Sequence, residues 1–564
     1  MLISLFAWAY ISLICLIWGN MLLSLLSRSG APASNPVNAC LVCFAGLAGI
    51  SAVVLCLSLF IPLGLPAHIL ILAPALYHCL KAEHRRSLRL QLQTLTDGVT
   101  ATGYCLWIAC ILMVLVISAY HIQHPDTLGY HARSVLLFEK YRPVPGIANL
   151  RQELGLVSSW FAALAIFKLD LPAFDHIIFL NGAVLCWYFT FLIPKITGTK
   201  HGWKWLLLLA FSILDPTAVR LTAASPSPDF IVTLYIWSAI YLFATAPDQQ
   251  DAARPDDRTT LHLIVLYCFA AILIKLSAIA IILLVPAAIF LTKRGRLSRL
   301  LLLYTGLGTL MFIPLFIRNI ISSGYLLYPS SIPDFFQVSW KMPATTIRQF
   351  ENYINIFARL AITTPLEHPE RFSFFRWVPT WWSGLGITDQ VLITGIIIGI
   401  ILNIAGVFFR SVRTKRLQTE VRSRIIPLLI VLTGSIVWFL KAPSPRFGFG
   451  MLIPLFYFLF LDGFKYAAIS SAVLRLLIAC STAATLSFSI YRFLYFFSSP
   501  MLLSPAGISN DGYLPIDCSV LKADLSQDII EVHPQTACPC NGEDQNRKLL
   551  PRGHTVSDGF QFGH

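Results

Sequence analysis

The sequence predicts an all-α polytopic membrane protein of about 12–14 transmembrane helices, with interfacial helices in a long first external loop and a small external C-terminal tail. Three observations indicate this class. Apolar residues make up 56% of the chain, charged residues only 12%, and the mean hydropathy is +0.70. Apolar runs long enough to cross roughly 30 Å of hydrocarbon recur down to about residue 490. Lys and Arg are concentrated in the short polar segments between these runs.

The expected spans follow from the apolar runs taken in order. They lie near residues 4–26, 39–61, 65–80, 98–119, 175–194, 203–221, 228–246, 261–276, 278–292, 299–317, 389–409, 425–440, 448–461 and 465–488. The first run has no charged n-region and no small-residue cleavage site, so we interpret it as a span and not as a removable signal.

Basic clusters set the expected orientation, because short loops rich in Lys and Arg are cytoplasmic. The clusters are Lys81/Arg85/Arg86/Arg89, Lys195/Lys200/Lys204, Lys293/Arg294/Arg296/Arg299 and Arg410/Arg413/Lys415/Arg416/Arg422/Arg424. All four fall on one side only if the run Leu154–Leu169 does not cross the membrane. That run is short and contains two serines, so we expect an amphipathic helix in the outer interface. The net charge of +14 then belongs to one membrane face and does not point to nucleic acid.

This topology divides the chain into three parts. Residues 1–97 form N-terminal membrane helices, and 98–490 form a transmembrane core with external loops at 120–174 and 318–389. Residues 491–564 form an external tail whose Gly- and charge-rich end, Pro551–His564, is expected to be disordered. Of the 13 cysteines, only Cys518, Cys538 and Cys540 lie in a polar segment, which makes them the disulfide candidates.

Asp126 is the candidate catalytic residue, because ionisable groups at the membrane edge are costly and commonly functional. It follows the span 98–119 by a few residues, and Tyr130 and His131 follow it at helical spacing. A carboxylate here can act as a general base on a hydroxyl or amine nucleophile. The alternative is a helix N-cap, since Pro125-Asp126 before a helical stretch is a standard start signal. The two roles are compatible, and both stay open.

Four basic residues are expected at the outer ends of spans: Lys275, Arg318, Lys441 and Arg446. Converging there, they could hold a phosphate or pyrophosphate group. Taken singly, each is better interpreted as a side chain that snorkels to water and lipid phosphate. Arg446 is the exception, because it lies in a Pro-Arg-Phe-Gly turn between apolar helices. Asp229 ends a Ser-Pro-Ser-Pro-Asp segment and is either a second acidic group of the site or, as this pattern favours, an N-cap.

Several classes of site are absent from the sequence. There is no Gly-rich phosphate loop followed by Lys and Ser or Thr, no dinucleotide fingerprint and no HExxH motif. Nucleotide-driven transport and soluble nucleotide-sugar chemistry are therefore unsupported. No cofactor is expected with certainty, and a divalent metal is possible without a ligand cluster behind it.

Several of these features resemble the GT-C superfamily of membrane glycosyltransferases, such as the aminoarabinose transferase of lipid A and the protein O-mannosyltransferases. Asp126 matches the position of the family's catalytic aspartate, and Leu154–Lys168 looks like its second juxtamembrane helix. Lys275-Leu276-Ser277, Arg318-Asn319 with the following Gly324 to Pro329, and Pro445-Arg446-Phe447 resemble its later motifs. The combination also resembles a bacterial group of polytopic membrane proteins. This chain carries a single Asp126 where many GT-C members have an acidic pair, and it has extra spans before that loop.

The resemblance implies a multi-pass glycosyltransferase of the bacterial inner membrane, active on the external face. Its donor would be a polyprenyl-phosphate-linked sugar, and its acceptor an external glycan, lipid or protein. Asp126 would be the base. Tyr130, His131, Asp229, Lys275, Arg318, Asn319, Lys441 and Arg446 would bind substrate. Two alternatives stay open: a flippase or transporter for lipid-linked glycans, and a protein similar to O-antigen polymerases and ligases.

Overall fold

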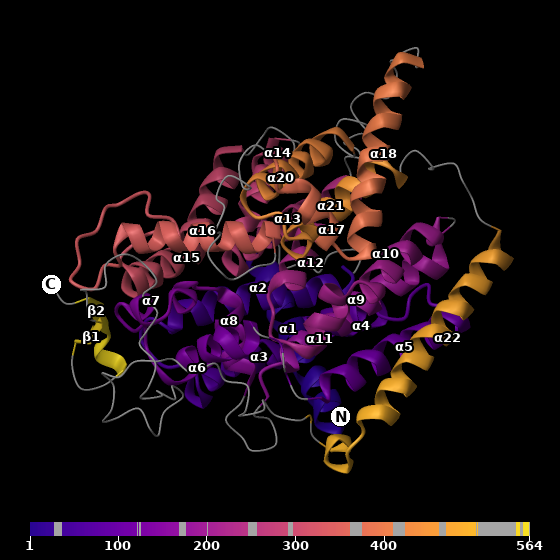
Figure 1. The fold of residues 1–564 in the computed structure, drawn as a ribbon. Helices are drawn as coiled ribbons and strands as arrows, with labels where there is room; N and C mark the ends of the chain where they lie inside the picture. Colours follow the sequence, from indigo (N-terminus) through magenta and orange to yellow (C-terminus); the bar gives the residue numbers. More distant parts are fainter. Residues whose placement is uncertain are drawn as a thin grey trace.

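The computed structural model confirms the all-α class (Figure 1). It describes residues 1–27, 37–120, 122, 124, 126–168, 176–199, 201–245, 257–290, 297–360, 375–409, 424–461, 470–503, 505, 549–552 and 556–562. The disulfide candidates Cys518, Cys538 and Cys540 lie outside these residues, as do most members of the basic clusters after residue 290.

Each expected span coincides with a helix. The first half of the chain contains α1 (Leu2–Ser27), α2 (Ala39–Leu57), α3 (Leu65–Leu80), α4 (Ala82–Gln93), α5 (Ala101–Ser118), the π-helical turn η1 (Thr127–His131), α6 (Ala132–Lys140), α7 (Ile147–Leu150), η2 (Gln152–Gly155), α8 (Ser159–Lys168), α9 (Phe179–Gly198), α10 (Gly202–Leu214), η3 (Pro216–Arg220), α11 (Leu221–Ala224), α12 (Asp229–Thr245) and α13 (Asp257–Ile274). The second half contains η5 (Leu276–Leu283), α14 (Leu284–Phe290), α15 (Leu297–Ser323), α16 (Ala344–Leu360), α17 (Val378–Gly384), α18 (Ile387–Phe409), α20 (Ile426–Lys441), α21 (Pro445–Leu459), α22 (Ser471–Phe496), η11 (Ser499–Leu502), β1 (Leu549–Pro551), η13 (Val556–Asp558) and β2 (Phe560–Phe562).

Fewer helices meet the length and apolarity of a span than the 12–14 expected. Among the described residues, seven helices meet both criteria, and nine do if two bent pairs each count as one span. Those pairs are α3 with α4, bent by 99°, and α10 with η3–α11, bent by 58°. The other expected spans are apolar helices of 10–17 residues, among them α12, α13 and α21. The fold is that of a helical membrane protein, with several of its apolar helices too short to cross alone.

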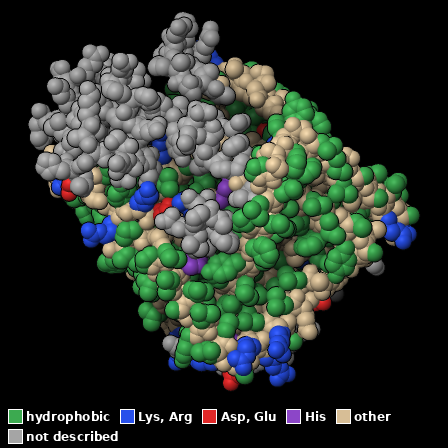
Figure 2. Space-filling view, turned by 90° about the horizontal axis from the view of Figure 1, so that it is seen from below, with side chains coloured by type: hydrophobic (Ala, Val, Ile, Leu, Met, Phe, Trp, Pro, Cys, Tyr) green, Lys and Arg blue, Asp and Glu red, His purple; other side chains and the backbone are tan. Residues whose placement is uncertain are grey.

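The outer surface of the helices is apolar over wide areas, as Figure 2 shows for one face. Leu302, Leu310 and Leu494 are each more than 70% exposed on α15 and α22. Side chains of this kind face lipid in a membrane protein, whereas a soluble protein rarely leaves such large patches uncovered. The α22 helix packs along α5, although the two are far apart in the sequence (Figure 1).

The helix expected in the outer interface differs from its prediction. The α8 helix has ten residues, too few to span a bilayer, and every one of them is buried. It packs against α2, α3, α6, α9 and α13, and the Lys168 amine at its end lies 2.9 Å from the Glu139 carboxylate of α6. The expected amphipathic character is therefore wrong for this helix. Its run of Trp, Phe, Ala and Leu is apolar all round, which suits a fully enclosed position.

The end of the C-terminal tail is also not as expected. Strands β1 and β2 pair antiparallel, and β2 lies beside α7 (Figure 1). Phe560 is 1% exposed and its backbone N–H donates to the Pro145 carbonyl at 2.9 Å. Gly146 permits this contact, because a Cβ there would lie 2.1 Å from the Phe560 carbonyl oxygen. The expectation of disorder from composition is therefore wrong for the described part of Pro551–His564, which gains order by burying Phe560.

Candidate active site

Four charged side chains from separate parts of the chain meet in one cluster, here called the charge cluster: Asp126, Asp229, Lys275 and Arg446. Arg446 Nη2 lies 2.9 Å from the Asp126 carboxylate, and Arg446 Nε lies 3.7 Å from that of Asp229. Lys275 Nζ lies 2.5 Å from the other oxygen of Asp229. These four residues, which lie far apart in the sequence, therefore meet in one place in the fold.

The charge cluster is built from helix ends and breaks. Asp126 precedes η1, Asp229 opens α12, Lys275 separates α13 from η5, and Arg446 is the second residue of α21. Pro445 occupies the first position of α21, where its missing N–H costs nothing. Lys275 has extended backbone angles and forms the turn between α13 and η5. Interrupted helices leave polar backbone groups and charges together, which an uninterrupted apolar helix cannot do.

Asp126 does not act as a helix cap. Its carboxylate makes no capping hydrogen bond to η1, and it pairs with Arg446 instead. The His124 Nδ1 accepts the Asp126 backbone N–H at 3.2 Å and fixes the approach to the turn. The Asp126 side chain is 31% exposed, whereas that of Asp229 is 8% exposed. Of the two carboxylates, Asp126 is therefore the more accessible.

Asp229 belongs to the cluster, and the favoured interpretation as an N-cap is wrong. The Ser227 hydroxyl accepts the Asp229 backbone N–H at 3.4 Å, so serine performs the capping role at the start of α12. The Asp229 carboxylate is free to contact Lys275 and Arg446. Two carboxylates and two cations give the cluster a formal charge of zero, which reduces the cost of burying it.

Lys275 and Arg446 are positioned rather than snorkelling. Lys275 Nζ lies 3.8 Å from the centre of the Phe447 ring and also forms the ion pair with Asp229. The turn before Arg446 is held by two indole N–H groups: Trp381 donates to the Pro443 carbonyl and Trp438 to the Ser444 carbonyl, both at 2.8 Å. A cation fixed between a carboxylate and an aromatic face keeps one orientation.

The start of α8 supports the cluster, a role that sequence reasoning missed. The Ser158 hydroxyl donates to the Ile274 carbonyl at 2.7 Å, next to Lys275. The Trp160 indole donates to the Pro226 carbonyl at 3.2 Å, in the segment that carries Asp229. The hydroxyl of Ser158 within the apolar run and the indole N–H of Trp160 were the available signal.

A second set of bonds ties the Asp126 turn to the same segment. The Thr127 and Ser225 hydroxyls are hydrogen-bonded at 2.8 Å, and both side chains are buried. The Asn181 amide of α9 donates to the Ser227 carbonyl at 3.3 Å. Asp126 and Asp229 therefore hold their relative positions through their neighbours as well as through Arg446.

Tyr130 and His131 lie beside the cluster in the π-helical turn. The His131 ring packs 4.3 Å from the Tyr130 ring and 5.3 Å from the Phe161 ring, measured between centres. Burial lowers the pKa of His131 to about 3, against the opposing influence of Asp126 and Asp229. Burial likewise lowers the pKa of His124. Both imidazoles are neutral at physiological pH, so they do not add charge to the cluster. Short π-helical turns are common at functional sites.

Three expected site residues do not join the cluster. Arg318 Nη1 donates to the Ser58 carbonyl and hydroxyl oxygens at 3.1 and 2.7 Å. The Asn319 amide donates to the Leu326 carbonyl at 3.0 Å and stabilises the turn after α15. Lys441 ends α20 with an exposed side chain and, among the described residues, contacts neither carboxylate of the cluster. The expected convergence of four cations is therefore reduced to two.

A metal ion has no evident place in the part of the chain that the structure describes. No three His, Cys, Asp or Glu side chains come together there in a group able to hold one. Asp126 and Asp229 offer carboxylate oxygens, but Arg446 and Lys275 already occupy them. A metal at this site would have to displace one of these cations.

The comparisons with known proteins identify a family and no activity. No curated protein and no solved structure matches the chain. A family model with the description "Domain of unknown function (DUF8201)" matches residues 1–453. The match covers more than half of the chain and includes all four residues of the charge cluster. The chain therefore belongs to the DUF8201 family.

Proposed function

We propose that the protein is an integral-membrane glycosyltransferase with Asp126 as its general base. The observation that carries the proposal is the state of the Asp126 carboxylate. It has no capping role, it is accessible, and a fixed guanidinium holds it at 2.9 Å. A carboxylate kept at a polar turn after an apolar helix, without a capping role there, is suited to accepting a proton.

In the proposed reaction the donor is a polyprenyl-phosphate-linked sugar, and the acceptor is a glycan, lipid or protein hydroxyl or amine on the external face of the bacterial inner membrane. The acceptor attacks the anomeric carbon and Asp126 takes its proton. The bond from that carbon to the phosphate oxygen breaks, the electron pair leaves with the polyprenyl phosphate, and the configuration inverts. Tyr130 and His131 form the wall beside the base.

Lys275 and Arg446 supply positive charge for the leaving phosphate in this scheme. When Asp126 accepts a proton, its negative charge is lost and the cluster becomes positive by one unit. That gain arises in the same step in which the leaving group becomes more negative. Charge stabilisation that appears only during the reaction accelerates it more than tight binding of the substrate does. Asp229 keeps both cations in place throughout.

The test is turnover of lipid-linked sugar in membranes that contain wild-type protein or Asp126→Asn at matched expression. We expect the amide to abolish transfer, because it cannot accept the proton. Asp334→Asn is the matched control, since this aspartate is 45% exposed and pairs with Lys341 instead of with a residue of the charge cluster. Wild-type turnover in Asp126→Asn would overturn the base role and would favour the transporter or polymerase alternatives.

A further inference from the structure

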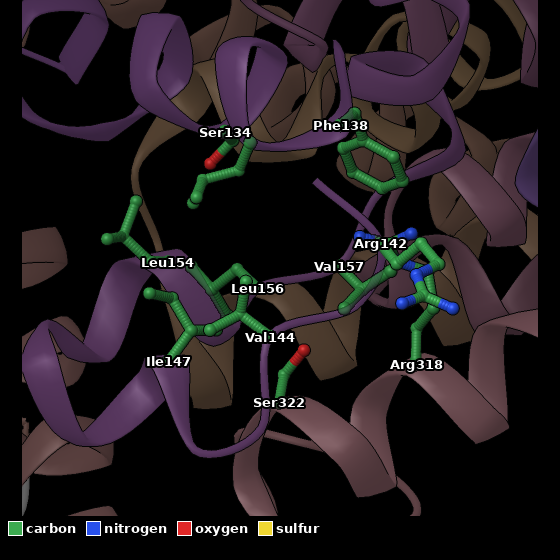
Figure 3. Close-up of a pocket in the computed structure, with 11 residues that line it drawn as sticks. Ser134, Phe138, Arg142, Val144, Ile147, Leu154, Leu156, Val157, Arg318 and Ser322 are labelled. Carbon is green, nitrogen blue, oxygen red and sulfur yellow. The ribbon is translucent and has the colours of Figure 1, made fainter. Parts of the chain in front are cut away.

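A separate pocket lies between α6, the segment around α7 and η2, and α15 (Figure 3). Its lining combines an aliphatic wall with a few polar groups. The lining residues are Ser134, Leu137, Phe138, Arg142, Val144, Ile147, Leu154, Leu156, Val157, Arg318 and Ser322. None of the four residues of the charge cluster belongs to it.

Arg318 brings an uncompensated charge to this pocket. Its side chain is buried, with 5% of the residue exposed, and its guanidinium stacks 3.9 Å from the centre of the Phe138 ring. Ser58 satisfies Nη1, but the buried Nε has no partner among the described residues. No carboxylate in the described part of the chain pairs with it. A buried cation without a counter-charge is unfavourable unless a ligand supplies one.

Other polar groups of the pocket are also available. The Ser134 hydroxyl is buried and has no hydrogen-bond partner among the described residues. Ser322 lies across the pocket from Ser134, and Arg142 and Arg318 lie at one end (Figure 3). Arg142 is exposed, so it marks the side that opens to solvent. A buried guanidinium, a second arginine and hydroxyl donors form a donor set for an oxyanion.

We propose that this pocket binds the phosphate group of an amphiphilic molecule, with Arg318 as its central ligand. The oxyanion would lie against Arg318, Ser134 and Arg142. The apolar part would follow the aliphatic wall formed by Leu137, Val144, Ile147, Leu154, Leu156 and Val157. This site differs from the charge cluster, whose cations are already paired, and it does not depend on glycosyl transfer.

The experiment measures binding to the purified full-length protein in detergent. The probes are dioctanoyl phosphatidic acid, dioctanoylglycerol with the same chains, and inorganic phosphate, each followed by the rise in Tm with concentration. We expect saturable stabilisation by phosphatidic acid and none by dioctanoylglycerol. If inorganic phosphate binds as tightly as phosphatidic acid, the oxyanion site stands and the amphiphile is overturned.

Variants separate the pocket from the general positive charge of the protein. Arg318→Met is expected to weaken phosphatidic acid binding by at least about ten-fold, because a charge-assisted contact is lost. Ser134→Ala should weaken it to a smaller extent. Lys441→Met is the matched control: it removes an exposed cation outside the pocket and should bind as wild type does. Equal binding by Arg318→Met and wild type, or an equal loss in Lys441→Met, would overturn the proposal.

A further variant covers the case in which Arg318→Met does not fold. Ser134→Leu keeps the guanidinium and fills the pocket with four carbon atoms instead of a hydroxymethyl group. Binding of phosphatidic acid should be lost in this protein while its Tm without ligand remains measurable. Retained binding would place the lipid elsewhere and overturn the assignment.

Discussion

The charge cluster and the Arg318 pocket solve the burial of cations in opposite ways. In the cluster, Lys275 and Arg446 are matched by Asp229 and Asp126 at distances of 2.5–3.7 Å. In the pocket, the Arg318 guanidinium has the oxygens of Ser58 and the Phe138 ring, but no carboxylate among the described residues. A balanced cluster holds its own geometry without a ligand. A pocket with an unpaired cation can gain free energy by binding an anion. This difference is why we propose proton transfer at the cluster and the binding of a resting anion at the pocket.

The largest expected effect is that of Asp229→Asn on stability. The side chain is 8% exposed and faces both cations, so its neutralisation leaves Lys275 and Arg446 with one carboxylate between them. Removal of one partner from a buried ion pair costs about 3–5 kcal/mol. We expect the free energy of unfolding to fall by that order, and the Tm and the yield of folded protein to fall with it. The measurement is thermal unfolding of the purified variant.

Lys275→Gln combined with Asp229→Asn tests the cause of that loss. If charge imbalance is responsible, the double variant should recover part of the stability that Asp229→Asn loses. A double variant less stable than either single one would contradict the balance argument and would indicate that the two side chains matter through packing.

An effect of intermediate size on the stability of the folded protein is expected when the pH is lowered, because of His131. Its pKa in the folded protein is lowered to about 3, by burial first, while an unfolded histidine titrates near 6.5. The charges that act on it are Asp126, Asp229, His124 and Arg446. A lowered histidine pKa favours folding above pH 6.5 and penalises it below, because the unfolded chain then takes up a proton that the folded chain cannot. From pH 7 to pH 5 this penalty reaches about 2 kcal/mol.

Thermal unfolding of wild type and His131→Phe at these two pH values measures the penalty. The variant keeps an aromatic ring between Tyr130 and Phe161 and cannot protonate, so its Tm should fall less on acidification. Parallel falls in the two proteins would show that His131 takes up its proton equally in the folded and the unfolded chain, so that burial does not keep it neutral. The charge balance of the cluster would then not depend on a neutral imidazole.

The sequence predicted the helices well and the site in part. Apolar runs placed a helix at each expected span, because the cost of exposing backbone in lipid leaves no other structure. The Lys and Arg pattern predicted that Asp126, Lys275 and Arg446 share one end of the fold, and they do. A local pattern could not separate the two roles of Asp229, since Ser-Pro-Ser-Pro-Asp suits a cap equally well. Only the contact with Lys275, 46 residues later, decides it.

Long-range packing explains the remaining differences. The α8 helix has the length of an interfacial helix, but its enclosure depends on α2 and α13, which are distant in sequence. Phe560 gains order from Pro145 and Asn149, more than 400 residues earlier, and its own Gly-rich surroundings give no sign of that contact. Arg318 was grouped with the other cations by its position at a helix end. Its side chain instead donates to Ser58, which follows α2 and lies 260 residues earlier in the sequence.

The smallest expected effect, that of Arg318→Met on the ligand-free protein, is the most direct test of the contrast between the two regions. Methionine keeps an unbranched apolar side chain and removes a charge that no described carboxylate offsets. The substitution removes the cost of burying an unpaired charge and also loses the hydrogen bonds to Ser58. Because these two effects oppose each other, we expect a change within about 1 kcal/mol. Thermal unfolding of delipidated protein, beside Asp229→Asn under the same conditions, gives the comparison. A loss in Arg318→Met as large as in Asp229→Asn would mean that the guanidinium stabilises the fold by itself, and the pocket would then need no anion.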